Sequence, residues 1–215
     1  PFTGIQGIQK LPAAHVLRIN WETGAINLEQ YWKLPEGPAL DVSEKELTSM
    51  IDASISEAVK LRMISDVPLG AFLSGGVDSS AVVAHMRRHS EQVRTFSIGF
   101  KGLKSEIPDA ERTAKHLGVQ SFSEELEPDV LGILPTLVRT YDEPFGDPSC
   151  IPTYFLCQST HKHVTVALSG DGGDENFGGY YRYPILRFSE PLSRLPGVLR
   201  KTTEKAARLW NVLRK

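Results

Sequence analysis

The stretch VPLGAFLSGGVDSSAVVAHM, residues 67–86, joins an apolar run to an amphipathic run through a turn that contains two glycines. Residues 67–73 have the length and composition of a buried β-strand, and SSAVVAHMRRH at 79–89 has those of a helix. A glycine-rich turn that leaves a strand and opens a helix presents backbone N–H groups to an anion. The stretch therefore predicts a strand–turn–helix unit with a phosphate site at its turn.

Strand and helix signals alternate along the rest of the chain. Alternation with short links is typical of a mainly parallel sheet flanked by helices, in which ligands gather where the strands end. We therefore expect the α/β fold class. The further strands are expected at 93–100, 121–126 and 164–168, and the further helices at 43–64, 109–118, 129–141 (interrupted by a proline) and 152–162.

The N-terminal part of the sequence has a different pattern. Residues 11–33 predict two strands around a turn at 22–24, and 34–40 have the proline and glycine content of a linker. A two-stranded hairpin is marginal in water, so we expect it to pack on a further domain. Ser43 and Glu46 then form a capping-box signature at the start of a helix. The sequence predicts two parts, 1–35 and 36–215.

Composition and charge narrow the class of function. With 24 basic and 26 acidic residues among 215, the net charge of -2 argues against a general nucleic-acid binder. No apolar run reaches the length of a membrane span. Cys150 and Cys157 form no disulfide framework, so we expect a reducing, cytoplasmic setting and two buried thiols. No third metal ligand stands beside the pairs His85 and His89 or His161 and His163, so we expect no metal site at these histidines. The basic tail at 200–215 predicts an amphipathic helix.

Asp78 stands inside the glycine-rich turn, where a bare carboxylate would repel a polyphosphate. A divalent cation that binds both removes the conflict, and Mg²⁺ is commonly held by one or two carboxylates together with substrate phosphates. The absence of a lysine after the glycines excludes a Walker loop. Asp78 could instead only stabilise the N-terminus of the helix through the helix dipole. That alternative leaves the neighbouring donors Ser74, Ser79 and Ser80 unexplained.

A second loop, LSGDGGDENFGGY at 168–180, also follows an apolar β-branched run and opens with Leu-Ser-Gly. Asp171, Asp174 and Glu175 stand among its glycines. Two such loops at two strand ends favour one shared ligand over two unrelated loops, with Asp78 and Asp174 holding Mg²⁺ from opposite sides. A third loop, YDEPFGDPSCIPTY at 141–154, leaves open metal ligation, recognition of a substrate amine, and helix capping.

FLSGGVDSS resembles the pyrophosphate loop of the ATP pyrophosphatase superfamily, whose fold is of the adenine nucleotide alpha hydrolase-like (HUP) type. Together with TFSIGF, DEPFGDPSCIPTY and VALSGDGGDENFGGYYRY, in that order, it resembles the synthetase domain of the glutamine-hydrolysing asparagine synthetase family. The N-terminal residues resemble the end of that family's glutaminase domain and the linker after it. The resemblance covers residues 2–190.

The resemblance implies roles for single residues. Asp78 and Asp174 would bind Mg²⁺, and Glu175, with Asp171 as an alternative, would face the acceptor substrate. Asp78, Asp174 and Glu175 are thus the expected catalytic groups. The residues expected to contact ATP are Leu73, Ser74, Gly75, Gly76, Asp78, Ser79, Ile98, Ser169 and Gly170.

The implied reaction has two steps. A substrate carboxylate, aspartate in the family, attacks the α-phosphate of ATP to give an acyl-adenylate and pyrophosphate. Ammonia from the glutaminase domain then gives the amide and AMP. We expect no nucleic-acid or membrane partner, and a homodimer is left open.

Departures from the family pattern set further expectations. The family's glutaminase nucleophile is a cysteine after the initiator methionine, whereas this chain begins at Pro1, and a basic catalytic residue of the family is not found up to Lys215. We therefore expect a truncated fragment that is incomplete for turnover.

In one branch of the family the loop that corresponds to 141–154 carries a Thr-Thr-x-Arg element associated with aspartate recognition. This element is absent here, so an acceptor carboxylate other than aspartate stays open. A non-catalytic ATP-binding module is the alternative from another class, and an RNA-thiolating relative fits the charge and cysteines poorly.

Overall fold

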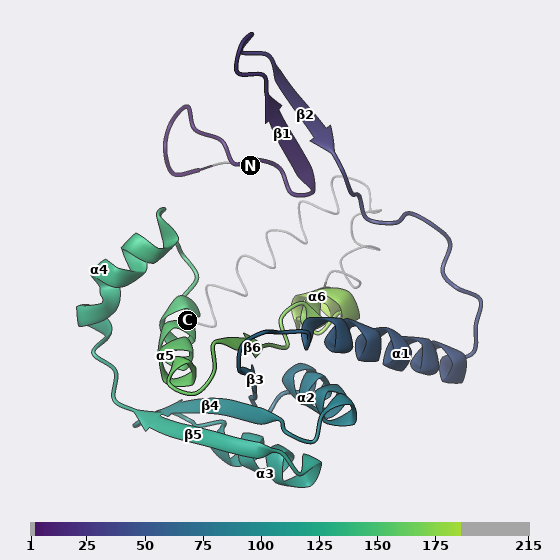
Figure 1. The fold of residues 1–215 in the computed structure, drawn as a ribbon, viewed down its shortest axis with the longest axis vertical. Helices are drawn as coiled ribbons and strands as arrows, with labels where there is room; N and C mark the ends of the chain where they lie inside the picture. Colours follow the sequence, from purple (N-terminus) through teal and green to yellow (C-terminus); the bar gives the residue numbers. More distant parts are fainter. Residues whose placement is uncertain (1–2, 186–215) are drawn as a thin grey trace, which may run out of the picture.

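A four-stranded parallel sheet lies at the centre of the structure, a computed structural model that describes residues 3–185 (Figure 1). Its strands are β3 (Leu69–Phe72), β4 (Arg94–Phe100), β5 (Gln120–Leu126) and β6 (Val166–Leu168), in the order β5-β4-β3-β6. All three neighbouring pairs run parallel, with Ala71 opposite Thr95 on one side and Leu168 on the other. The predicted α/β class is confirmed.

Helices connect the strands and cover the sheet. Helix α2 packs on α1, α3 and β3, whereas α3 packs on β4 and β5, and α5 on β4. The helices are α1 (Glu44–Arg62), α2 (Val77–His89), α3 (Ile107–Leu117), α4 (Val130–Tyr141), α5 (Cys150–His161) and α6 (Gly173–Phe177).

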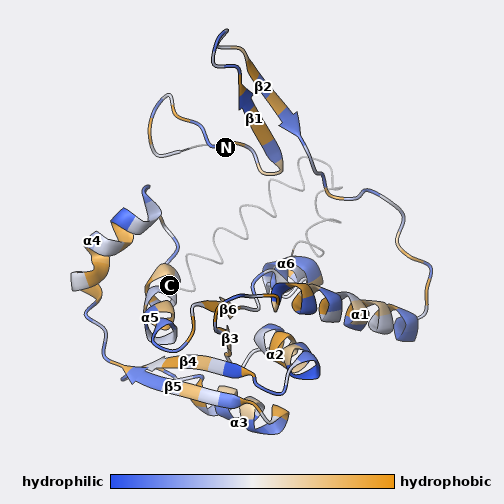
Figure 2. Ribbon diagram, viewed as in Figure 1, coloured by the Kyte–Doolittle hydropathy of each residue, from blue (hydrophilic) through white to orange (hydrophobic). Residues whose placement is uncertain are grey.

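The side chains of the central strands alternate between two apolar layers, as the two-residue period of a strand requires. On one face Ala71 and Leu73 pack into a cluster with Val83 and Met86 of α2 and with residues of α1 and α3. On the other face, Phe96 of β4 stacks on Phe122 of β5, and Phe100 meets Phe155 of α5 edge-on. Apolar and polar residues alternate along β4, and the polar Thr95 and Ser97 are buried as well. Figure 2 shows the mixed hydropathy of this strand.

The capping box at the start of α1 forms as predicted. The Ser43 hydroxyl accepts a hydrogen bond from the Glu46 backbone N–H, and the Glu46 carboxylate accepts from the Ser43 backbone N–H at 2.9 Å. The two bonds satisfy N–H groups that a helix start leaves without partners. They fix the point at which the chain enters the α/β part.

The predicted hairpin consists of β1 (His15–Ile19) and β2 (Ile26–Gln30), which pair antiparallel. It stands apart from the sheet in Figure 1, joined to α1 by an extended stretch. Its strands are largely exposed, and Trp21 at its turn is 97% exposed. Within the described residues the hairpin therefore does not pack on a core. The boundary predicted near residue 35 stays a prediction.

Four local expectations are wrong. Residues 173–177 form α6 instead of loop, and α4 continues through Pro135 without interruption. Cys157 is exposed and Cys150 half-buried, so the thiols expected in the core lie at its margin. Helix α2 begins at Val77 instead of residue 79, because Gly76 takes the extended N-cap conformation, and Asp78 and Ser79 thus belong to its first turn. The tail at 200–215 lies outside the described residues.

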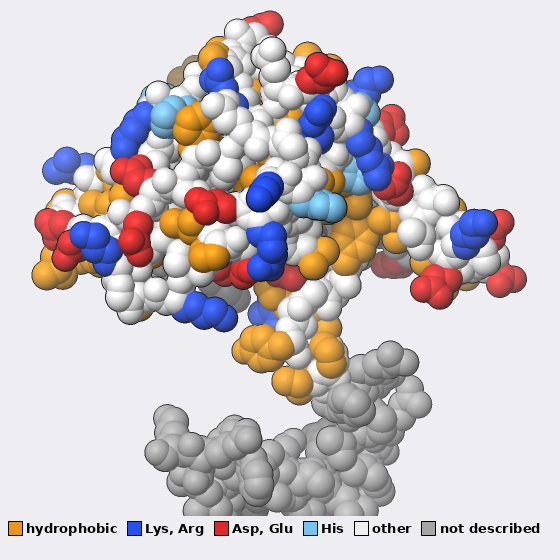
Figure 3. All heavy atoms as spheres, turned by 90° about the horizontal axis from the view of Figure 1, so that it is seen from below, with side chains coloured by type: hydrophobic (Ala, Val, Ile, Leu, Met, Phe, Trp, Pro, Cys, Tyr) orange, Lys and Arg blue, Asp and Glu red, His pale blue; other side chains and the backbone are white. Residues whose placement is uncertain are grey.

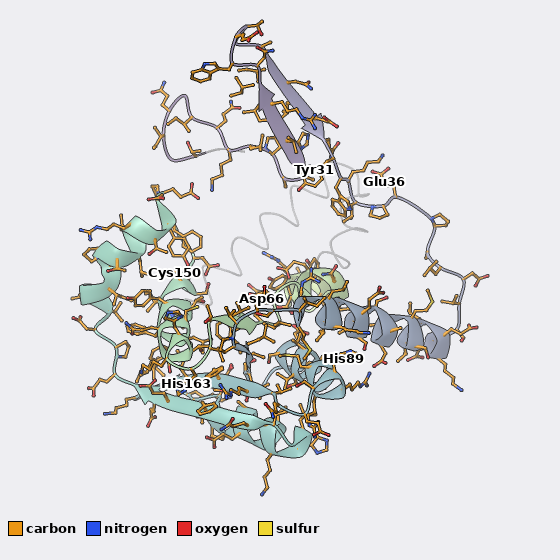
Figure 4. All side chains as sticks on the ribbon, in the orientation of Figure 1. Tyr31, Glu36, Asp66, His89, Cys150 and His163 are labelled. Carbon is orange, nitrogen blue, oxygen red and sulfur yellow. The ribbon has the colours of Figure 1, made fainter. Side chains whose placement is uncertain are left out.

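Two of the histidines lie where α1 packs on α2. His85 is buried within 3.6 Å of Asp52, and His89 shares a 2.9 Å hydrogen bond with the Ser56 hydroxyl of α1 (Figure 4). His163 stacks on Phe122 at 4.7 Å between ring centroids. All three side chains therefore have packing roles.

Acidic and basic side chains are interspersed over the face shown in Figure 3. Among the helices of residues 3–185, none combines the length and the apolar character needed to cross a bilayer.

Candidate functional site

A cavity of about 680 Å³ opens where β3, β4 and β6 end. Both glycine-and-acid loops contribute to its wall, as the sequence predicts. Of the predicted site residues, those that line the cavity are Leu73, Ser74, Gly76, Asp78, Ser79, Ile98, Ser169, Gly170, Asp174 and Glu175, together with the alternative Asp171. Gly75 is the exception: its Cα faces α3, where an added Cβ would lie 2.4 Å from the Cβ of Asp109.

The end of β3 is fixed by hydrogen bonds to β4. The Leu73 N–H donates to the Phe96 carbonyl at 2.9 Å, and the buried Ser97 hydroxyl donates to the Leu73 carbonyl at 2.5 Å. Both polar groups of Leu73 are therefore engaged just before the turn. The first loop leaves the sheet from a rigid anchor.

The serines of the first loop hold its shape. The hydroxyls of Ser74 and Ser79 lie 2.8 Å apart, and the Ser74 hydroxyl accepts from the Gly76 N–H at 3.2 Å. Ser79 is only 8% exposed, so its hydroxyl acts inside the loop. The turn is folded around its own side chains, and α2 begins at the cavity with the partial positive charge of a helix N-terminus.

The second loop is pressed onto the first turn of α2. A Cβ added to Gly170 would lie 2.7 Å from the Ser79 backbone nitrogen, and one added to Gly173 would lie 2.4 Å from Cγ of Asp78. Real Cβ atoms do not approach so closely. Backbone atoms obstruct a side chain at Gly170, so only glycine fits there, whereas a side chain at Gly173 would force the Asp78 carboxylate to move. Gly179 is equally close to Asp174, so three of the loop's five glycines have a packing reason.

Short hydrogen bonds order the acids of the second loop. The Ser169 hydroxyl donates to Asp171 at 2.8 Å, and the Tyr180 hydroxyl donates to Glu175 Oε1 at 2.5 Å. The bond from Tyr180 is the main cause that lowers the pKa of the Glu175 carboxyl below its usual value, and the same bond raises the pKa of Tyr180 to about 12.

The third loop reaches the cavity only through its helical end, where Pro152 and Thr153 of α5 form part of the wall. Asp147 instead accepts a bond from the Ser149 backbone N–H at 2.9 Å, which lowers the pKa of its carboxyl. Glu143 pairs with Lys10 at 2.6 Å. Asp147 thus shapes a turn before α5, and Ser149, the N-cap residue of that helix, makes no side-chain capping bond.

Several wall residues have no counterpart in the sequence-based prediction. Aromatic and apolar side chains come from β3, β4 and α5, and their alternation along the strands was the available signal. These additional residues are Phe72, Phe96, Ser97, Phe100, Glu106, Leu156, Gly172 and Tyr180.

The charge of the cavity wall is strongly one-sided. Five carboxylates line it, and no lysine or arginine of the described chain does so; the five belong to Asp78, Glu106, Asp171, Asp174 and Glu175. An anionic ligand would therefore need its own cations. Among residues 3–185 no cluster of three or more His, Cys, Asp and Glu side chains forms a complete metal cage. Two carboxylates beside a phosphate loop nonetheless fit Mg²⁺ that arrives with a polyphosphate, because the phosphates and water supply the other ligands.

Two curated relatives align with most of this chain. Asparagine synthetase [glutamine-hydrolyzing] 1 of Bacillus subtilis is 40% identical over 182 residues, which are 83% of this chain and 28% of that protein. A putative asparagine synthetase [glutamine-hydrolyzing] 2 of Methanocaldococcus jannaschii is 39% identical over 215 residues, 95% of this chain and 40% of that protein. The chain thus spans less than half the length of either relative.

Among solved structures, a glutamine-dependent NAD+ synthetase from Acinetobacter baumannii in complex with ADP is similar with a TM-score of 0.42 and 21% identity. The alignment covers 76% of this chain and 31% of that one. The family model described as asparagine synthase matches residues 50–215, well over half of the sequence. With this match and relatives at 39–40% identity, the chain belongs to the asparagine synthase family.

Proposed function

We propose that the cavity binds ATP with Mg²⁺ and that the domain activates a carboxylate as its acyl-adenylate for amide formation. One observation carries the proposal: Gly170 and Gly173 bring the second loop onto Ser79 and Asp78. This contact unites two Leu-Ser-Gly loops and the carboxylates of Asp78 and Asp174 at one cavity.

Each part of the wall has a role in this proposal. The N-terminal turn of α2 holds the phosphates, with Ser74, Gly75, Gly76, Ser79, Ser169 and Gly170 around it, and the adenosine lies by Leu73 and Ile98. Asp78 and Asp174 hold the metal. Mg²⁺, when bound, offsets the repulsion between polyphosphate and the acidic wall and stabilises the charge of the departing pyrophosphate.

The proposed chemistry needs no covalent nucleophile from the protein. An oxygen of the acceptor carboxylate attacks the α-phosphorus of ATP, and the bond to pyrophosphate breaks. Ammonia then attacks the acyl carbon, the carbon–oxygen bond to the phosphate breaks, AMP leaves with that oxygen, and the new amide nitrogen loses a proton. The protein accelerates the first step by alignment and by charge stabilisation. Glu175 faces the acceptor.

The acceptor and nitrogen source are proposed from the relatives. Their names as glutamine-hydrolysing asparagine synthetases support aspartate as acceptor and ammonia derived from glutamine. On this proposal residues 1–35 are the end of a glutaminase domain and residues 36–215 belong to the synthetase domain. The two free cysteines support a reducing, cytoplasmic setting.

The test is pyrophosphate release by the full-length gene product from ATP and Mg²⁺. The acceptor panel contains aspartate, glutamate, a sugar acid and a peptide with a free carboxyl group. We expect release that depends on one carboxylate, and exchange of labelled pyrophosphate into ATP. A folded protein that binds ATP but shows neither reaction with any acid would be a non-catalytic module, and the proposal would be wrong.

A further inference from the structure

Tyr180 is part of the cavity wall beside Glu175, although it follows α6 by several residues. Helix α6 ends at Gly178, whose φ of 68° turns the chain, and the Gly179 N–H then donates to the Asp174 carbonyl at 3.0 Å. This turn returns Tyr180 to the helix it has just left. Its hydroxyl reaches Glu175 Oε1 at 2.5 Å.

A second contact holds the Tyr180 ring. The guanidinium carbon of Arg182 lies 4.5 Å from the ring centroid, within the range of a cation–π interaction. The ring of Tyr183 lies 5.8 Å away on a tilted plane. Three successive structural features, the turn, the cation and the neighbouring ring, therefore fix the direction of the Tyr180 hydroxyl.

The hydrogen bond has a defined direction. The phenol O–H is the donor, because an ionised carboxylate can only accept. At neutral pH the pair is therefore a protonated tyrosine and an ionised glutamate. Among residues 3–185, Tyr180 is the one side chain that hydrogen-bonds the Glu175 carboxylate, and the backbone N–H of Glu175 itself also lowers the pKa of this carboxyl.

We propose that Tyr180 is a positioning residue that orients Glu175 at the cavity wall and leaves its second oxygen to the acceptor substrate. This inference rests on the proposed function, in which Glu175 faces the acceptor. Tyr180 itself does not touch the reacting atoms. A neutral donor suits this task, because a cation at the same place would compete with a cationic group of the acceptor for Glu175.

The kinetic test compares Tyr180→Phe with Tyr181→Phe in the full-length gene product. Tyr181 is the neighbouring tyrosine and is 84% exposed, so its change is a matched control. We expect Tyr180→Phe to raise the KM for the active carboxylate about tenfold, the effect of one lost hydrogen bond to a charged group, and to leave the KM for ATP unchanged. The kcat should change less than the KM, because Tyr180 does not touch the reacting atoms.

A spectroscopic test examines the pair without substrate. Tyrosine is labelled at its ring carbon Cζ, the Tyr180 resonance is identified by its loss in Tyr180→Phe, and the labelled protein is titrated. Tyr180 should stay protonated where ordinary tyrosines ionise, near pH 10, and should titrate with them in Glu175→Gln. Ionisation of Tyr180 together with the other tyrosines in the unaltered protein would overturn the proposal.

The outcomes also separate this inference from the proposed function. An unaltered protein that releases no pyrophosphate with any acid overturns the proposed function and the role of Tyr180 with it. An active protein in which Tyr180→Phe and Tyr181→Phe have the same KM for the carboxylate overturns the role of Tyr180 alone.

Discussion

Gly173, the first residue of α6, and Asp78, in the first turn of α2, lie in direct contact, although the two helices follow two different strands. A Cβ on Gly173 would lie 2.4 Å from Cγ and 2.6 Å from Oδ2 of Asp78. The position of the Asp78 carboxylate therefore depends on a glycine far away in the sequence. Several consequences of this arrangement can be measured.

Replacement of Gly173 by alanine should displace the Asp78 carboxylate. We expect overpacking to cost about 1–3 kcal/mol of stability. ATP affinity in the presence of Mg²⁺ should fall by more than the affinity without metal, as measured by calorimetric titration. Gly37→Ala is the control, because a Cβ on Gly37 meets nothing within 4 Å. Equal loss of affinity with and without Mg²⁺ would show that Asp78 is not a metal ligand.

Asp78→Asn and Asp174→Asn should each remove one carboxylate from the proposed metal site. We expect pyrophosphate release to fall on the order of a hundredfold or more in either variant, as for the loss of one preorganised electrostatic group. The Mg²⁺ concentration for half-maximal rate should rise. Asp66→Asn changes an exposed acid outside the cavity and should leave both quantities unchanged. A normal Mg²⁺ dependence in either cavity variant would contradict the pairing.

Ser79→Ala should loosen the first loop, because the Ser79 hydroxyl joins Ser74 at 2.8 Å and donates to the Gly76 carbonyl at 3.3 Å. A lost hydrogen bond of this kind costs about 1 kcal/mol, so ATP affinity should fall about fivefold. Ser80→Ala is the matched control: its hydroxyl donates to the same Gly76 carbonyl at 2.6 Å but does not line the cavity. Equal affinities in the two variants would contradict a role of Ser79 in loop shape.

The Glu46 carboxyl at the start of α1 should make the free energy of unfolding depend on pH in the acidic range. Bonds from Ser43 lower the pKa of the Glu46 carboxyl from its ordinary 4.5. Because the pKa of Glu46 is lower in the folded state, ionised Glu46 contributes to the free energy of unfolding. This contribution is complete above the unfolded-state pKa and is lost as the pH falls through the lower folded-state pKa. Glu46→Gln keeps the cap but cannot ionise, so thermal unfolding of this variant should be less sensitive to acid.

Ser43→Ala should lower stability at neutral pH by about 1 kcal/mol, through the lost N-cap. The control is Ser54→Ala, because Ser54 is exposed in the middle of the same helix, and this change should leave the stability unaltered. Parallel acid dependence of unfolding in Glu46→Gln and the unaltered protein would show that this carboxylate does not contribute.

The sequence predicted the parts of the site that depend on local chemistry. Leu-Ser-Gly after an apolar run indicated each loop, and the acids within the loops indicated where a cation is needed. The side chains that close the cavity depend on tertiary packing. Leu156 reaches it because α5 packs on β4, and Tyr180 because α6 turns back at Gly178. No short pattern around either residue shows such a contact.

The difference between local chemistry and tertiary packing also explains the wrong predictions for α6, Pro135 and the cysteines. Helix α6 was missed because the flanking glycines oppose helix formation, whereas packing on the first turn of α2 supports it. Pro135 was read as an interruption, yet α4 continues through it. The exposure of Cys157 follows from the face that α5 turns to β4, which spacing alone does not specify.

The pairing of Ala71 with Leu168 has a consequence for folding. These partners lie about a hundred residues apart, so β6 joins β3 only after a large loss of chain entropy, and contacts of such separation form slowly. The first loop can therefore take shape on the β3–α2 unit long before the second loop reaches it. Acquisition of nucleotide affinity during refolding should lag behind helix formation, which makes ATP a reporter for the last strand to enter the sheet.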